Sequence, residues 1–286
     1  MPASPPADPT HDARPAPRFV SGSLLRHVAV MSGTGAIGLI AIFLVDLINL
    51  FYISLLGQQA VAAAVGFAGV VGFFQLSFCI GLMIAVAAVV APAIGAGRHA
   101  EAQRLGTVSL LLMGLTCTLL AALSYATLDP LLSLLGASGE TKTQAHNYLQ
   151  ISLASTPLLG VSMACSALLR AAGDARRAMN VTLIGAVITA VLDPILIFAL
   201  HLDLQGAAIA AVLARLCMLL IGLHGVTRAH RLLGPLQGDS LGADNRRLCQ
   251  VAGPAILANL ATPCGAAFVT HAMAQFGPAA IAGQAT

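Results

Sequence analysis

The stretch AVLDPILIFAL, Ala190 to Leu200, is apolar except for one carboxylate, Asp193, which is followed directly by Pro194. The rest of the chain has the same character, because 58% of its 286 residues are hydrophobic and only 9% are charged. A soluble domain carries about 25% charged residues. The composition therefore predicts an all-α integral membrane protein, in which the position of Asp193 inside a span needs a physical reason.

Seven apolar runs are long enough to cross a bilayer as helices, since one span needs about 20 apolar residues. They cover residues 28–54, 60–94, 105–127, 146–169, 180–200, 206–227 and 249–276. The second run exceeds one perpendicular span, so we expect it to be tilted or to extend past the bilayer. The turn-rich segment 128–140 is expected to hold a short interfacial helix.

The lysines and arginines are distributed asymmetrically along the chain. With a cytoplasmic N-terminus, 12 of the 14 fall in cytoplasmic segments, whereas Lys142 lies outside and Arg215 lies within the sixth span. This asymmetry follows the positive-inside rule. It predicts a multi-pass protein of the inner cell membrane. Because the basic residues follow the membrane and form no patch, we expect no nucleic-acid partner.

Three residues in the spans carry a full charge: Asp46, Asp193 and Arg215. An ionised side chain at mid-membrane costs at least about 2.5–3.5 kcal/mol, so it normally faces protein or a water-filled cavity. Both acids lie seven or eight residues before the outer ends of their spans, which places them about 10–12 Å below the outer surface. We interpret them as a coupling pair for a proton or cation that lines one cavity. Pro194 is then a hinge, because it removes a backbone hydrogen bond.

The structural alternative is that Asp46 caps a helix end and Asp193 pairs with Arg215, which lies a few ångströms deeper. In the functional version, Arg215 instead tunes the acid. Asn49 and Thr189 each lie one turn from an acid and can share its helix face. The other neutral polar residues expected to line the cavity are Gln75 and Asn180.

An internal similarity relates two segments that follow the first and seventh spans. LLGQQAVAA (55–63) resembles QFGPAAIAG (275–283), and an even number of spans separates the two copies. Such a parallel repeat is typical of transporters built from two six-span halves.

Five stretches, taken in order, resemble the multidrug and toxic compound extrusion (MATE) family, in particular its DinF-like branch. They are VDLINLFYISLLGQQAVAAAVG (45–66), GAGRHAEAQRL (95–105), LLRAAGDARRAMN (168–180), LDPILIFALHLDLQGAAIAAVLAR (192–215) and AGPAILANLATPCGAAFVTHAMAQFGPAAIAG (252–283). The resemblance extends from about residue 26 to the end of the chain.

The resemblance implies an exporter that works by alternating access and exchanges small organic compounds, often cationic drugs, for H⁺ or Na⁺. It implies no enzymatic activity and no cofactor besides the coupling ion. Asp46 falls on the family's first-span acid and Asp193 on the fifth-span acid of the DinF-like branch. Thr189 stands where that branch has Asn, and Ala211 where it has Thr. A Na⁺ site at Asp193 and Thr189 thus lacks ligands of the family pattern, so protons are favoured.

The expected organisation is a six-helix MATE-type N-terminal lobe followed by the first helix of a second lobe. The predicted segments are a disordered cytoplasmic tail (1–25), the six-span lobe (26–228), a cytoplasmic linker (229–248) and the start of the second lobe (249–286). Because the family pattern has twelve spans, we expect the chain to be truncated after the seventh. Its partner would be a missing C-terminal lobe or a second copy, besides the lipid bilayer and small organic substrates.

Three alternatives remain open. The chain could be a non-transporting fragment or pseudogene product. It could be related to lipid-linked oligosaccharide flippases, which should carry more arginine and lysine in the cavity. It could also be an intramembrane serine protease that uses Ser162 and His224, although Asp46 and Asp193 would then have no role.

Overall fold

The computed structural model describes residues 24–55, 59–200, 202–236 and 238–277, together with 280, 281 and 283. These residues form helices and turns, with no strand among them. The helices are α1 (Leu24–Leu55), α2 (Gln59–Gly95), α3 (His99–Ala126), α4 (Leu128–Leu134), α5 (Gly139–Ala154), α6 (Thr156–Ala171), α7 (Ala175–Pro194), α8 (Asp203–His224) and α9 (Gly238–Ala274). Two short π-helical segments, η1 (Ile195–Ala199) and η2 (Gly225–Ala229), extend α7 and α8.

The predicted all-α membrane architecture is confirmed. Six of the described helices are long and apolar enough to cross a bilayer, or seven if α5 and α6 are counted as one bent span. The short helix predicted in the segment 128–140 is present as α4. Residues 1–23, most of the predicted tail, lie outside the described residues.

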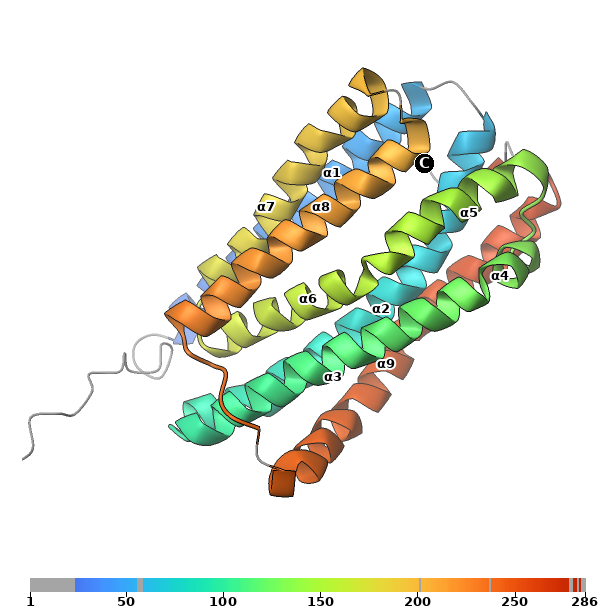
Figure 1. Ribbon diagram of the computed structural model, residues 1–286. Coiled ribbons are helices and arrows are strands. Elements are labelled where there is room, and N and C mark those ends of the chain that lie inside the picture. The colour runs from blue at the N-terminus through green and yellow to red at the C-terminus, as the bar shows by residue number, and fades with distance from the viewer. Residues whose placement is uncertain are drawn as a thin grey trace, which may run out of the picture.

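The helices form two groups with a bent span between them (Figure 1). Helices α1, α7 and α8 pack together in one group, and α2, α3 and α9 in the other. The α5–α6 pair contacts members of both groups, because α8 packs on α5 and α6 while α2 and α3 pack on their other sides. The position of α5 and α6 therefore determines how the two groups meet.

The prediction of one continuous helix at 146–169 is wrong, because the fourth span breaks at Ser155. Helices α5 and α6 meet there at an angle of 46°. The physical reason lies in Pro157, at the start of α6. Proline has no backbone N–H, so it cannot donate to the carbonyl four residues earlier, and it restricts the residue before it.

Half of the predicted linker is helical, since α9 begins at Gly238 rather than near residue 249. The segment from Arg231 to Gly234 lies along α3, where the Gln103 amide donates to the Arg231 carbonyl at 2.7 Å. The Thr107 hydroxyl donates to the Gly234 carbonyl at 2.9 Å and accepts from the Gly234 N–H at 3.0 Å. These bonds attach the segment before α9 to the N-terminal end of α3.

A second attachment joins α3 directly to α9. The guanidinium of Arg104 bonds to both carboxylate oxygens of Asp244, with Nε at 2.6 Å and Nη2 at 3.3 Å. The Asp244 side chain is only 2% exposed. Such two-point pairing holds both groups in one geometry.

A substitution at Gly106 on α3 tests how closely the segment before α9 packs on this helix. A Cβ atom at this position would overlap the carbonyl oxygen of Leu232. We expect Gly106→Ala to lower the free energy of unfolding by about 1–3 kcal/mol, the usual cost of overpacking. Thermal unfolding of the purified chain, followed by circular dichroism, measures the effect.

The matched control is Gly114→Ala on the same helix, where the nearest atom would be a Val161 methyl at an ordinary 3.5 Å. Because alanine favours helix over glycine by up to about 1 kcal/mol, this variant should melt at or above the wild-type temperature. Equal melting of both variants would contradict the tight packing of Leu232 on Gly106.

Candidate functional site

The carboxylate of Asp193 is buried in α7 without a partner. The residue is 1% exposed, and neither of its carboxylate oxygens has a hydrogen-bond partner in the described part of the chain. A buried polar group without a partner is costly, and a buried unpaired charge is costlier still. Packing therefore gives no reason for this side chain.

The backbone next to Asp193 departs from regular α-helix. Pro194 is the last residue of α7, and the following turn is π-helical, with the Leu200 N–H bonded to the Ile195 carbonyl at 3.1 Å. Proline cannot donate to the carbonyl four residues before it, and π-helical turns inside helices occur frequently at functional sites. The predicted hinge thus lies at an irregular turn, while motion about it stays a prediction.

Aromatic packing sets the register between α1 and α7, which run side by side in the same direction (Figure 1). The Tyr52 and Phe198 rings meet edge to face, with centroids 5.9 Å apart. Asp46 precedes Tyr52 by six residues and Asp193 precedes Phe198 by five, which places their backbones within about 2 Å of one level. The Asp46 side chain lies outside the described residues, so a cavity shared by both acids stays a prediction.

The neutral residues predicted around the acids have different surroundings. The side-chain oxygen of Asn49 is buried and has no partner among the described residues. The Thr189 hydroxyl donates to the Gly185 carbonyl of its own helix at 3.1 Å. Asn180 is exposed, and it lies about 20 Å before Asp193 along α7.

The predicted alternative of an Asp193–Arg215 ion pair is wrong. Close packing of Gly206 on Leu196, where a Cβ atom would lie 2.8 Å from the backbone, fixes the register of α7 and α8. Because the two helices are antiparallel, this register places Asp193 level with about residue 209 of α8. Arg215 lies six residues further on, or about 9 Å along the axis.

The guanidinium of Arg215 bonds instead to the break in the fourth span. Its Nη1 atom donates to the Ser152 carbonyl at 2.9 Å and to the Ser155 hydroxyl at 2.5 Å. Thr156, the next residue, donates its hydroxyl to the side-chain oxygen of Gln75 on α2. We call Gln75, Ser155, Thr156 and Arg215 the break cluster. A cation at the C-terminal end of α5 also complements the helix dipole.

Sequence reasoning found Gln75 and Arg215 but missed the serine and threonine of the break cluster. The signal for them was the run Ser155-Thr156-Pro157 inside an apolar stretch. Two hydroxyls beside a proline in a span indicate an interrupted helix whose freed carbonyls need donors.

A cavity of about 350 Å³ adjoins the break cluster between α2, α3, α4 and α9. Gln75 lines it, and the side-chain nitrogen of this residue has no partner within the described ranges. The walls are otherwise mainly apolar and include Phe74, Phe78, Leu120 and Leu260. This size and composition fall in the usual range of small-molecule sites.

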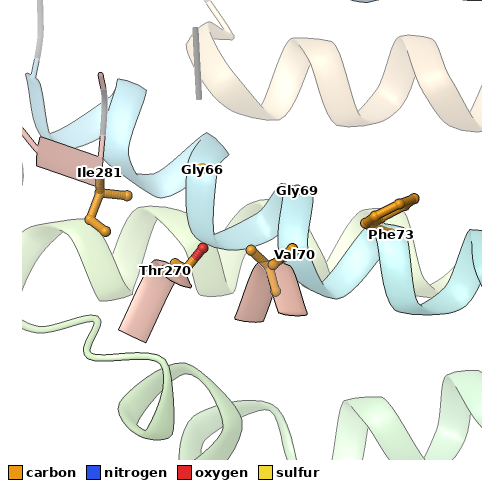
Figure 2. A pocket seen from close by; sticks show the side chains of 7 residues that line it. Gly66, Gly69, Val70, Phe73, Thr270 and Ile281 are labelled. Atoms are coloured by element: carbon orange, nitrogen blue, oxygen red, sulfur yellow. The ribbon is translucent and has the colours of Figure 1, made fainter. Parts of the chain in front are cut away.

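A second cavity, of about 240 Å³, lies between α2 and α9. Figure 2 shows Gly66, Gly69, Val70 and Phe73 on the α2 side, and Thr270 and Ile281 on the side of the C-terminal segment. Val70 lines both cavities. Two glycines on one helix face leave the space that this cavity occupies.

The arrangement needed for a serine protease is not formed by the residues considered for it. The Ser162 side chain is buried, and its hydroxyl donates to the Leu159 carbonyl at 2.8 Å. No hydrogen bond joins Ser162 to His224 within the part of the chain that the structure describes.

Comparison with known proteins identifies the family. The MatE family model matches residues 36–195, which is more than half of the chain, and the chain therefore belongs to the MATE family. An FAD transporter of Shewanella oneidensis is 31% identical over 270 residues, which are 92% of this chain and 60% of the relative. The DNA damage-inducible protein F of Escherichia coli is 32% identical over 43% of the chain and 27% of its own length. The predicted family resemblance is confirmed.

Solved structures support the same fold. The bent form of the Vibrio cholerae MATE transporter VcmN matches with a TM-score of 0.79 at 29% identity, over 91% of this chain and 59% of its own. A MOP superfamily transporter from Pyrococcus furiosus has the same TM-score at 24% identity, over 86% and 55% of the two chains. The chain thus spans somewhat more than half the length of these transporters.

Two of the buried aspartates provide a test of whether Asp193 has a structural role. Asp244 is paired with Arg104 and Asp193 is unpaired, although both are 1% exposed. We expect Asp193→Asn to leave the melting temperature unchanged or to raise it. Asp244→Asn should lower the free energy of unfolding by about 1–3 kcal/mol, because it breaks a largely buried ion pair.

Thermal unfolding of both variants by circular dichroism, under identical detergent conditions, makes the comparison. A loss of stability in Asp193→Asn as large as that in Asp244→Asn would show that Asp193 holds the fold together.

Proposed function

We propose that the chain is the ion-coupling lobe of a secondary active antiporter, which exports organic compounds in exchange for H⁺ by alternating access. One observation carries this proposal: Asp193 is buried in a span, and neither of its oxygens has a partner among the described residues. Ionisable residues inside spans normally mark ion or substrate pathways.

The chemistry of an unpaired carboxyl group suits a coupling role. In a dry environment such a group is tolerated as the neutral acid, whereas contact with water allows it to ionise. A change in water access at the irregular turn after Pro194 would therefore load or release a proton. The backbone of Asp46 lies at nearly the same level on α1, so a second acid in the same path fits the proposal.

Protons are better supported than Na⁺ as the coupling ion. A Na⁺ site needs several oxygen ligands, but Ala211 has no side-chain oxygen. Asp193 alone can carry a proton without further ligands. Na⁺ at Asp193 and Thr189 is the alternative, which the choice of driving gradient distinguishes.

The substrate, membrane and assembly are part of the same proposal. The family resemblance suggests organic cations, and the name of the Shewanella relative adds FAD as a substrate candidate. The distribution of Lys and Arg favours the inner membrane with a cytoplasmic N-terminus. A second lobe, either a C-terminal one or a second copy of this chain, would complete the translocation path.

Ethidium efflux from cells that lack their own pumps tests the proposal. We expect efflux with the wild-type chain, and at least about a tenfold loss in Asp193→Asn, because an amide cannot exchange the proton that drives the cycle. Asp203→Asn is the matched control, since Asp203 is exposed at the start of α8 and should keep its efflux.

The proton and Na⁺ gradients across the membrane are varied separately in the same cells. Efflux should collapse when a protonophore removes the proton gradient and should persist without Na⁺. Unchanged efflux in Asp193→Asn would contradict the coupling role. A wild-type chain that reaches the membrane and gives no efflux would contradict transport by this chain on its own.

A further inference from the structure

The cavity of about 350 Å³ belongs to the helix group that proton coupling does not use. It lies between α2, α3, α4 and α9, whereas Asp193 lies on α7, which packs with α1 and α8. Asp193 is not among the described residues that line this cavity. The coupling carboxylate therefore gives no reason for the space, and the lining itself must indicate what the space can hold.

The walls of the cavity favour an uncharged, largely apolar molecule. Among the described residues, its lining is aliphatic and aromatic apart from Gln75 and Ser124, and it includes no Asp, Glu, Lys, Arg or His. A charged group would lose its water in this cavity without finding a countercharge, which is costly. Phe74 and Phe78 lie one turn apart on α2 and offer rings for aromatic contacts. A neutral compound with aromatic rings matches these walls.

One polar group of the lining has an unused hydrogen bond. Gln75 is 6% exposed, and its side-chain oxygen accepts from the Thr156 hydroxyl. Its NH₂ group has no partner in the part of the chain that the structure describes. A buried donor without a partner costs about 1–3 kcal/mol, so an acceptor atom beside Gln75 would recover part of this cost. The matching occupant therefore carries a carbonyl or ether oxygen.

Helix α4 forms one wall of the cavity and is fastened to another. Leu131, Leu134 and Leu135 line the cavity from α4. The His271 ring on α9 donates from Nδ1 to the Leu134 carbonyl at 2.6 Å. This bond fixes the walls formed by α4 and α9 relative to each other.

We propose that this cavity is a binding site for neutral aromatic compounds that carry a hydrogen-bond acceptor, and that the Gln75 NH₂ group binds the acceptor. The volume lies at the lower end of the usual range for small-molecule sites, about 300–1,000 Å³. The inference goes beyond the proposed export in exchange for H⁺, because binding at this site does not depend on Asp193 and concerns uncharged compounds.

Benzophenone is a suitable probe, because it is neutral, has two aromatic rings and carries one ketone oxygen. Under near-ultraviolet light, the excited ketone takes a hydrogen atom from a nearby C–H group, and the two radicals join in a C–C bond. Mass spectrometry of the purified 286-residue chain in nonionic detergent then locates the labelled residues. We expect labelling of the lining segments 70–78 and 131–135, in excess over lipid-facing side chains such as Leu257 and Phe268.

Matched variants separate ligand binding from a structural role. Gln75→Met keeps a side chain of similar size but no N–H donor, and it should lower the excess labelling about threefold to tenfold. Thr156→Val removes the bond to the Gln75 oxygen and leaves the NH₂ group, so labelling should persist.

A second pair of variants tests the cavity itself and leaves Gln75 in place. Ala267→Leu fills the cavity and should abolish the excess labelling. Ala261→Leu, at an exposed position of α9 that lines neither of the two cavities, should not change it. Melting temperatures confirm that each variant retains the fold, and this second pair carries the test if Gln75→Met melts early.

Two charged probes test the class of ligand: 4-benzoylbenzoate, an anion, and 4-(trimethylammoniomethyl)benzophenone, a cation. Both should give at least about tenfold less excess labelling than benzophenone, because the lining offers no countercharge. Asp193→Asn should leave the labelling by benzophenone unchanged, so this site and the proposed export can fail separately.

Three results would overturn the inference. The first is labelling without excess over Leu257 and Phe268, which would show partition into the detergent only. The second is equal excess labelling by the neutral and charged probes. The third is unchanged labelling in both Gln75→Met and Ala267→Leu.

Discussion

In the middle of the span formed by α8, the guanidinium of Arg215 bonds to the carbonyl of Ser152 and the hydroxyl of Ser155, where the fourth span breaks. Hydrocarbon offers no water to satisfy the backbone groups that a break exposes, so a neighbouring helix must supply the donors. Because α5 and α6 lie between the two helix groups, this contact also connects α8 to the helices on the other side. The break that Pro157 causes is therefore satisfied in part by one side chain of α8.

Among the described residues, the buried aspartates Asp174 and Asp244 have partners for their carboxylates, whereas Asp193 has none. Asp174 begins α7, where its carboxylate accepts from the Arg177 N–H at 3.1 Å and contacts His230 at 2.9 Å. Burial alone would raise the pKa of Asp174, but these hydrogen bonds and the charges of Arg177 and His230 lower it. Asp244 is paired in the same way with Arg104. Asp193 differs because the described part of the chain offers no partner to either of its carboxylate oxygens, so the cost of its burial is not compensated there.

Asp193 and Arg215 occupy neighbouring helices about 9 Å apart along the axis, and neither neutralises the other. A direct ion pair would have lowered the cost of both charges, and it would also have removed both from other chemistry. Their separation leaves the Asp193 carboxylate unpaired within the described residues, as its proposed coupling role requires.

The sequence by itself determined the membrane class, the helical fold and the family, because apolar length, charge asymmetry and motif order are properties of the chain that neighbours do not alter. It also located Asp193, Pro194 and Arg215 as residues that need an explanation. Only the tertiary structure decided that the fourth span breaks, that Arg215 bonds to that break, and that Gln75 lines a cavity beside it. Those outcomes depend on the register between helices far apart in the sequence, and close packing at Gly206, the Tyr52–Phe198 contact and the Arg104–Asp244 pair set that register. Hydrophobic periodicity does not encode such contacts, so the partner of a buried charge could not be read from the span that carries it.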